Sequence, residues 1–205
     1  MEQPIEYSIK SSFYDRKRKL ILSPNYIEFE DNDLANGSNT KFETKDIDSF
    51  RYGVKWIKGY AFTFGRIYSI EIKNKEGKII RLKLKSIYGI RKNKLFQKYA
   101  SIINSLLDLY FIPIAEQYIQ LYYNKEEFNF GPIKIKPEGV ELKNKKTILW
   151  EDLYTKNYYT KYSISSKSNK NDYCIFEYNE DWNTAVLFSV IEKILLDKKE
   201  GATAK

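Results

Sequence analysis

Two stretches of the chain decide the expected fold: KLILSPNYIEFE, residues 19–30, and IKIKPEGVEL, residues 133–142. In each stretch apolar and polar residues alternate, a proline interrupts the alternation, and a second alternating run follows. Alternation at every second position is typical of a strand with one buried face, and a proline with turn-forming neighbours is typical of a tight connection. Each stretch therefore predicts two antiparallel strands joined at Pro24 or at Pro137.

The similarity between the two halves continues downstream. Residues 41–47 (KFETKDI) align with residues 147–153 (TILWEDL), and both segments end in a charged residue, an aspartate and an aliphatic residue. The first half has a longer polar run, residues 31–40, which predicts a loop inserted into a hairpin. We interpret the two halves as two copies of one unit.

Further strands and a closing helix are expected in each unit. In the first unit, residues 68–73 and 78–85 predict a hairpin that turns at Gly77; in the second, residues 158–165 and 172–179 are the counterparts, and this unit has one or two fewer strand-like segments. Apolar residues at steps of three and four predict the closing helices. They are Phe96, Tyr99, Ile103, Leu106 and Tyr110 in the first unit, and Leu187, Ile191, Ile194 and Leu195, after a cap at Asn183, in the second.

These patterns predict an α+β chain that is mainly β. We expect a first unit at residues 1–111, a linking helix at 112–126 that Pro113 separates from the helix before it, a second and shorter unit at 127–198, and a disordered tail at 199–205.

The order of these elements resembles the bacterial pleckstrin-homology-like (PH-like) domains. It runs from a strand through a proline turn to a second strand, then the segment around Trp150-Glu151-Asp152, further strands and one terminal helix. The resemblance covers about residues 18–110 and 128–198, and the first unit has Thr44 where the second has Trp150. It implies an antiparallel barrel or sandwich in each unit, capped by the C-terminal helix, and places Trp150 in a core. It does not imply inositol-lipid binding, because the first hairpin turn, Ser23-Pro24-Asn25, has no basic residue.

Composition argues against an enzyme. The chain has no histidine, so it lacks the commonest general base and metal ligand, and Cys174 is its only cysteine. Glycine-rich phosphate loops and serine-nucleophile motifs are missing from the sequence. We therefore expect no catalytic residues, no cofactor, no metal site and no small-molecule substrate. The N-terminal sequence lacks a signal pattern, which predicts a cytoplasmic protein.

The net charge of +8 belongs to the first half alone: residues 1–111 have 21 Lys and Arg against 13 Asp and Glu, and residues 112–205 have 14 of each. A basic patch is therefore expected on the first unit, as an attachment site for an anionic membrane surface or as a merely solvated face; nucleic acid is not a favoured partner. The candidate residues are Arg16, Arg18, Arg81, Lys83, Lys85, Arg91 and Lys92.

A second candidate surface is rich in tyrosine. In a strand at residues 158–165, Tyr158, Thr160, Tyr162 and Ile164 would face one way, and Tyr159, Lys161 and Ser163 the other. One face must be core. Tyr154, Tyr159 and Lys161 are the candidates for an interface with a protein, because tyrosine is enriched at interfaces.

One enzymatic alternative remains. Glu71 and Lys73 lie in a φ-E-φ-K strand with Asp46 and Asp48 upstream, which resembles the Asp…Glu-x-Lys core of a superfamily of metal-dependent nucleases. Our leading expectation is a non-catalytic binding module that recognises a protein partner, as an adaptor or an immunity-type inhibitor. Attachment to an anionic membrane through the first unit is the second, and the nuclease is the third.

Overall fold

We describe the protein from a computed structural model, which covers residues 3–12, 15–33 and 38–203; the side chains of residues 201–203 are outside the description. The middle of the loop expected at residues 31–40 and the last two residues of the expected tail lie outside the described residues. The chain forms two compact units, Met1–Phe111 and Ile112–Lys205. The fold is mixed α and β, and mainly β.

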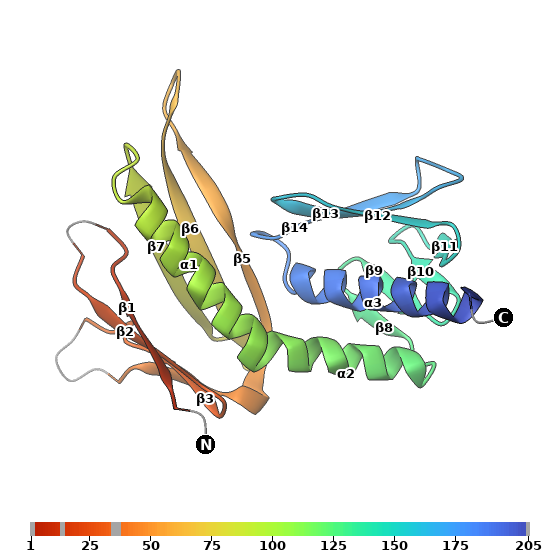
Figure 1. Cartoon of the computed structure of the whole chain (residues 1–205), viewed down its shortest axis with the longest axis horizontal. Helices are drawn as coiled ribbons and strands as arrows, with labels where there is room; N and C mark the ends of the chain where they lie inside the picture. The colour runs from red at the N-terminus through yellow and green to blue at the C-terminus, as the bar shows by residue number, and fades with distance from the viewer. Residues whose placement is uncertain (1–2, 13–14, 34–37, 204–205) are drawn as a thin grey trace. The chain divides into compact units, whose positions relative to one another are not determined.

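The first unit contains two antiparallel sheets, each with strands in chain order (Figure 1). The first sheet has four strands: β1 Ile5–Ile9, β2 Arg18–Ser23, β3 Tyr26–Phe29 and β4 Thr40–Glu43. A 3₁₀ turn at Thr44–Asp46 leads to the second sheet: β5 Ile47–Lys58, β6 Thr63–Asn74 and β7 Ile79–Ile87. The turn expected at Gly77 joins β6 to β7, and Gly77 has a φ of +84°, which glycine adopts without strain.

The helix α1, Lys92–Leu106, packs on β6 and β7 and closes the first unit. Its buried residues include Tyr99, Ile103 and Leu106, as the spacing predicted, whereas Phe96 is exposed. Tyr110 is also buried and lies in the π-helical turn Leu107–Phe111 that follows.

The helix does not break at Pro113. The π-helical turn continues directly into α2, Ile112–Tyr123. Proline lacks an N–H group and its ring clashes with the carbonyl four residues earlier, so it interrupts a regular α-helix. A π-helical turn in front of it changes the local spacing of the carbonyls and removes this conflict. The helix expected at 112–126 is therefore present as α2, but it is joined to α1 by a π-helical turn and not separated from it by a break at Pro113.

The second unit repeats the order of four strands, three strands and a helix. Its first sheet contains β8 Phe128–Phe130, β9 Ile133–Lys136, β10 Gly139–Glu141 and β11 Thr147–Leu149. The second sheet contains β12 Leu153–Asn157, β13 Lys161–Ser166 and β14 Tyr173–Glu177, and α3, Thr184–Thr203, follows.

Several expectations for the second unit were wrong. It has as many described strands as the first unit. The expectation missed β8 and β12, which have only three and five residues. The helix α3 extends through most of the segment expected to be a disordered tail. Tyr158–Thr160 form the connection between β12 and β13 rather than a strand. Among the described strands of both units, none of the four sheets closes into a barrel.

The proline turns are held by the same hydrogen bonds in both units. In the second unit the Trp150 amide donates to the carbonyl of Glu138 (3.2 Å), and the Trp150 indole Nε1 donates to the carbonyl of Pro137 (3.0 Å). In the first unit the Thr44 amide donates to Asn25 (2.9 Å), and the Thr44 hydroxyl donates to Pro24 (2.7 Å). Threonine and tryptophan therefore provide the same side-chain bond at positions that the sequence comparison aligned.

A third bond is shared. The amide of Lys75 donates to the carbonyl of Asp46 (2.9 Å), and the amide of Lys167 donates to that of Asp152 (2.8 Å). Trp150 is 5% exposed, so its expected position in a core is confirmed. The Asp152 side chain accepts bonds from the hydroxyl of Ser166 and from Ser168, which lower the pKa of its carboxyl group. These bonds fix the chain where each unit passes from its first sheet to its second.

Candidate binding surfaces

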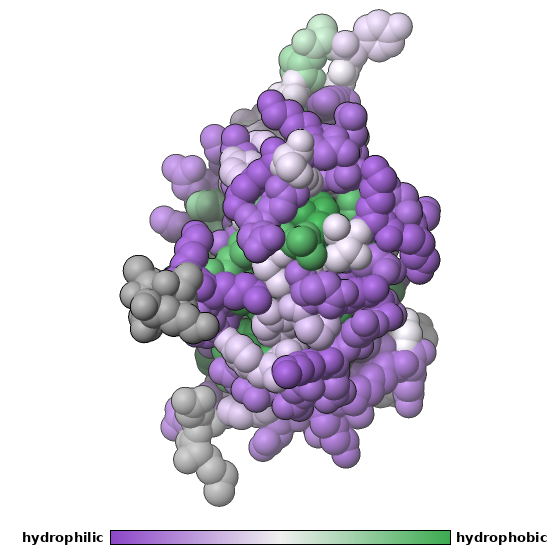
Figure 2. Space-filling model, turned by 90° about the vertical axis from the view of Figure 1, so that its right-hand side faces the viewer, coloured by the Kyte–Doolittle hydropathy of each residue, from purple (hydrophilic) through white to green (hydrophobic). Residues whose placement is uncertain are grey.

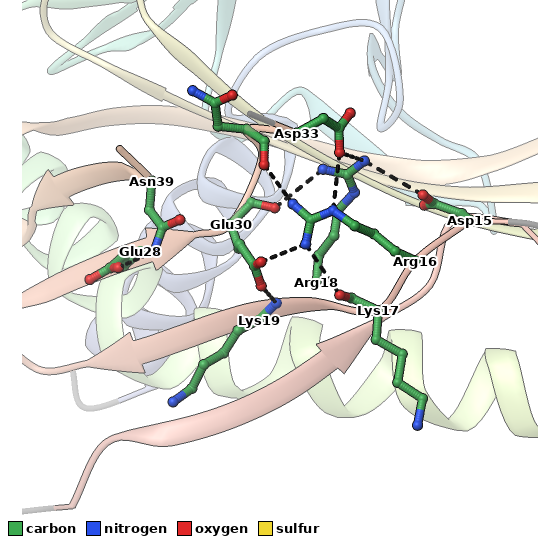
Figure 3. Close-up of polar contacts among 10 residues, drawn as sticks. Asp15, Arg16, Lys17, Arg18, Lys19, Glu28, Glu30, Asp33 and Asn39 are labelled. Atoms are coloured by element: carbon green, nitrogen blue, oxygen red, sulfur yellow. Dashed lines mark hydrogen bonds and ion pairs between the residues drawn. The ribbon is translucent and has the colours of Figure 1, made fainter. Parts of the chain in front are cut away.

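Arg16 and Arg18 form a cluster of ion pairs near the start of β2 (Figure 3). Arg16 bonds to Glu30 and to Asp33 (3.1 Å), and Arg18 bonds to Asp33 (2.8 Å) and Asp15 (3.5 Å). The Glu30 carboxylate accepts a hydrogen bond from the backbone amide of Lys19 in β2, and this bond together with Arg16 lowers the pKa of Glu30. Arg16 also lowers the pKa of Asp33. These two arginines of the expected patch therefore neutralise carboxylates of the same unit.

Arg81, Lys83 and Lys85 lie on one exposed face of β7, and Leu82 and Leu84 are buried on the other. The strand register adds two cations to this face: Arg51 and Lys55 of β5. We call the five residues the basic sheet face: Arg51, Lys55, Arg81, Lys83 and Lys85. The sequence pattern could not show that β5 contributes to it, because pairing between strands depends on the tertiary fold.

Glu71 of β6 lies on the basic sheet face between Arg51 and Arg81. Arg51 binds its carboxylate through Nη2 (2.8 Å) and Nε (3.0 Å), and Arg81 Nε lies 3.9 Å away. Lys73 lies 3.7 Å from Asp48. No group of three or more His, Cys, Asp and Glu side chains in the described parts of the chain is arranged to hold a metal ion. This arrangement gives the nuclease interpretation no support.

Arg91 and Lys92 follow β7, and Arg91 lines a cavity of about 450 Å³ with Lys10 and Lys85. The cavity walls also contain Ile87 and Ile90, so cationic and aliphatic side chains line it together. Lys92 begins α1 and is exposed. Of the predicted patch, the structure thus brings Lys85 and Arg91 together and leaves Arg16 and Arg18 in the separate ion-pair cluster.

The far end of the β5–β6 hairpin has a group of aromatic side chains that the sequence analysis missed. They are Trp56, Tyr60, Phe62, Phe64 and, from the loop after β7, Tyr88. We call them the aromatic tip. In Figure 1 this hairpin extends beyond β7 and α1 of its own unit, and its end, at the top of Figure 2, has hydrophobic and weakly polar atoms. The sequence feature that could have revealed this group is YAFTF, residues 60–64, in which every second residue is aromatic.

The second unit exposes a tyrosine-rich face on the sheet β12–β13–β14. Tyr154 of β12 lies opposite Ser165 of β13, which lies opposite Tyr173 of β14; the adjacent row contains Lys156, Ser163 and Ile175. We call these six residues the tyrosine face. Tyr154 and Tyr173 are 50% and 57% exposed, and Ile175 is also exposed.

The other residues predicted for this surface lie at its end. Tyr158 and Tyr159 are in the β12–β13 connection, and Tyr159 is 74% exposed. Lys161 begins β13, and its Nζ lies 5.4 Å from the centre of the Tyr158 ring. Tyr162 and Ile164 are completely buried on the opposite face of the sheet. Tyr154, Tyr159 and Lys161 are therefore outside the core.

Cys174 is on the opposite face of β14 from Tyr173 and Ile175, across from the buried Ile164, and its partial burial raises the pKa of its thiol. A raised thiol pKa disfavours the reactive thiolate. Within the part of the chain that the structure describes, none of the helices combines the length and the apolar content needed to cross a membrane.

Comparison of the chain with protein-family models, with curated proteins and with solved structures gives no match.

Proposed function

We propose that the protein is a non-catalytic binding module composed of two PH-like units in tandem. The proposal of a repeat is supported by the common order of four strands, three strands and a helix. It is also supported by the bonds of Thr44 and Trp150 to the carbonyls of Pro24 and Pro137. Two unrelated sheets would have no physical reason to be fixed at equivalent positions by equivalent bonds.

The partner we propose is a protein that binds the tyrosine face, and the observation that carries this proposal is the composition of that face. Large rings, Tyr154 and Tyr173, flank the small side chain of Ser165, and in the next row Ser163 lies between Lys156 and Ile175. Tyrosine provides a rigid apolar ring and a hydroxyl group, so it loses little conformational entropy on binding and can still form hydrogen bonds. The small side chain of Ser165 leaves room between the two rings for a side chain of the partner.

The charge of the second unit fits a protein partner better than a polyanion. Residues 112–205 have no net charge; on this side of the sheet Lys161 lies opposite Glu177, and Lys156 lies opposite Ser163. Binding there would depend on shape and apolar contact rather than on long-range attraction. A cytoplasmic adaptor, or an immunity-type inhibitor that occupies its target, would need this kind of surface and no catalytic group.

Site-specific crosslinking tests this proposal. A photoreactive residue is placed at Tyr173 in the full chain, expressed in its native host, and crosslinked products are identified by mass spectrometry. We expect one stoichiometric protein product, and none with the same residue at Glu43, an exposed strand position of the other unit. The identified partner is then purified and its affinity measured by calorimetry.

The double variant Tyr154→Ala with Tyr173→Ala should weaken that affinity by about 30-fold or more, as expected for central aromatic residues of an interface. Lys143→Ala, at an exposed position elsewhere in the second unit, is the matched control and should change it less than about twofold. Equal affinities for the double variant and the wild type would refute the role of the tyrosine face. If no crosslinked protein forms at any exposed position of the sheet, the proposal of a protein partner fails.

A further inference from the structure

The aromatic tip is exposed but ordered. The turn between β5 and β6 is closed by the amide of Gly59, which donates to the carbonyl of Phe62 (2.8 Å). Beyond this turn Tyr60 is fully exposed and Phe62 is 63% exposed. The side chains therefore project from a hydrogen-bonded hairpin, and burying them against a partner would require little ordering of the backbone.

The loop after β7 supports the aromatic tip in an unfavourable backbone conformation. The amide of Tyr88 donates to the carbonyl of Phe64 (2.7 Å), which joins the loop to the hairpin. Tyr88 and Arg91 have φ values of +50° and +55°, in the left-handed region that bulky residues avoid. Tyr88 is nevertheless 73% exposed, so its ring does not repay this strain by packing in the core. Strained, exposed residues of this kind suggest selection for contact with something outside the chain.

This end of the second sheet is basic throughout. Residues 49–70 and residues 77–107 contain no Asp or Glu, whereas both segments contain lysines and arginines. Arg66 lies over the Trp56 ring, 4.4 Å from its centre. The 450 Å³ cavity beside the loop is lined by Lys10, Lys85 and Arg91. The carboxylate of the basic sheet face, Glu71, lies farther along β6 from the tip.

We propose that the aromatic tip and the cations around it attach the first unit to the surface of an anionic lipid bilayer. Tryptophan and tyrosine prefer the boundary between headgroups and acyl chains, and phenylalanine is favourable slightly deeper. Lysine and arginine near an anionic leaflet each increase partitioning several-fold. The tip enters the headgroup region with Tyr60 and Phe62 first, and Lys58 and Arg66 remain at the level of the lipid phosphates.

The geometry favours a bilayer over other anionic partners. A hairpin end presents its rings as a convex point rather than as a groove or a flat platform, and a fluid bilayer accepts such a shape without a complementary pocket. Phe62 and Ile90 at this end also offer apolar area without hydrogen-bonding groups, which suits acyl chains better than a phosphate backbone. The proposal concerns a different unit and a different partner from the tyrosine face, so either can fail without the other.

Co-sedimentation of the full chain with vesicles tests the proposal. One set of vesicles contains equal parts of phosphatidylglycerol and phosphatidylcholine, and the other contains phosphatidylcholine alone. We expect binding to the first set that weakens at high salt, and at least tenfold weaker binding to the second. Equal binding to both sets, or no binding to the anionic vesicles, would overturn the proposal.

Variants identify the surface. The double change Tyr60→Ser with Phe62→Ser alters two exposed side chains and should reduce binding at least tenfold, with an unchanged circular dichroism spectrum. Tyr88→Gly should also reduce binding while the protein stays folded, since glycine accepts the positive φ at this position. The matched control is Leu196→Ser, an exposed apolar residue of α3 in the second unit, which should bind vesicles as the wild type does.

If the tip variants bind vesicles as well as the wild type, the aromatic tip is not the attachment site and the proposal is wrong. Competition with duplex DNA gives a separate answer. Displacement of the wild-type protein from anionic vesicles by DNA at equal charge concentration would indicate a nucleic-acid site and refute the lipid assignment. Retention on the vesicles supports it.

Discussion

The hydroxyl group of Tyr110 makes several contacts inside the first unit, although its helix and its partners are far apart in the sequence. Its oxygen accepts the amide hydrogen of Ser23 (3.1 Å) and lies 2.7 Å and 2.9 Å from the carbonyl oxygens of Ser23 and Tyr26. The residue is 2% exposed, and burial raises its pKa, so it stays protonated and can donate. The group therefore ties the π-helical turn to the first proline hairpin.

Tyr110→Phe removes this single oxygen and keeps the ring. One accepted and one donated hydrogen bond contribute about 1 kcal/mol each to the free energy of unfolding. The amide of Ser23, which would remain buried without its partner, adds a penalty of about 1–3 kcal/mol, part of which is already in the first figure. We expect a loss of about 2–4 kcal/mol from the stability of the first unit.

Tyr7→Phe is a matched control in the same unit. The Tyr7 hydroxyl also makes three contacts, with the carbonyl of Ser101 (3.2 Å), its hydroxyl (3.0 Å) and that of Ser105 (2.8 Å), but at a more accessible site. Water can replace these contacts when the oxygen is removed, so the loss should stay below about 1 kcal/mol.

Urea unfolding followed by circular dichroism gives both values, and amide hydrogen exchange at Ser23 shows whether the effect is local. Because the chain has two units, the exchange measurement assigns the change to the first of them. A Tyr110→Phe change below about 0.5 kcal/mol, or one equal to that of Tyr7→Phe, would refute the reasoning.

Three further outcomes can be measured on single variants or on the unmodified protein. Folding lowers the pKa values of Glu30 and Asp33, so the stability that these carboxylates contribute is present at neutral pH and is lost as the pH falls through about 4 and below. Urea unfolding at several pH values should show this decrease in the free energy of unfolding, and Arg16→Gln should make the decrease smaller. Trp150→Phe should lower the stability of the second unit by about 2 kcal/mol, half from the lost indole bond and half from lost packing, and an unchanged urea midpoint would contradict this. Cys174 should react slowly with iodoacetamide at neutral pH and rapidly in urea, because burial raises its thiol pKa; equal rates would contradict the assignment of a partly buried thiol.

The elements with strong periodicity could be predicted from the sequence. The proline hairpins, the turn at Gly77 and the helix face with Tyr99 and Leu106 follow from alternation, turn chemistry and the helical period. The short strands β8 and β12 could not be predicted, because the structure of so short a segment depends more on the strands packed beside it than on its own sequence pattern. The helix break predicted at Pro113 failed for a related reason. The prediction used the local rule that proline interrupts an α-helix, and this rule does not include a π-helical turn in front of the proline.

The candidate surfaces were harder to predict. The alternation of β7 placed Arg81, Lys83 and Lys85 on one face, and this was confirmed. The pattern did not reveal that Arg16 is held by carboxylates of another loop, because ion pairs between distant segments depend on tertiary structure. The aromatic tip was overlooked since aromatic residues in a β-rich chain are normally expected in the core, and only the tertiary fold shows which of them remain outside.

The order of the strands in the four sheets has a consequence for how this chain folds. Every strand pairs with the strand next to it in the sequence, so each pairing closes only a short loop. Contacts of low sequence separation form quickly, which favours early formation of the hairpins in each unit. During synthesis each hairpin can pair as soon as it leaves the ribosome, and the strands of the first unit can assemble before those of the second are made. The inner strands of each sheet would then stay unpaired only briefly, which limits aggregation of a chain so rich in aromatic residues.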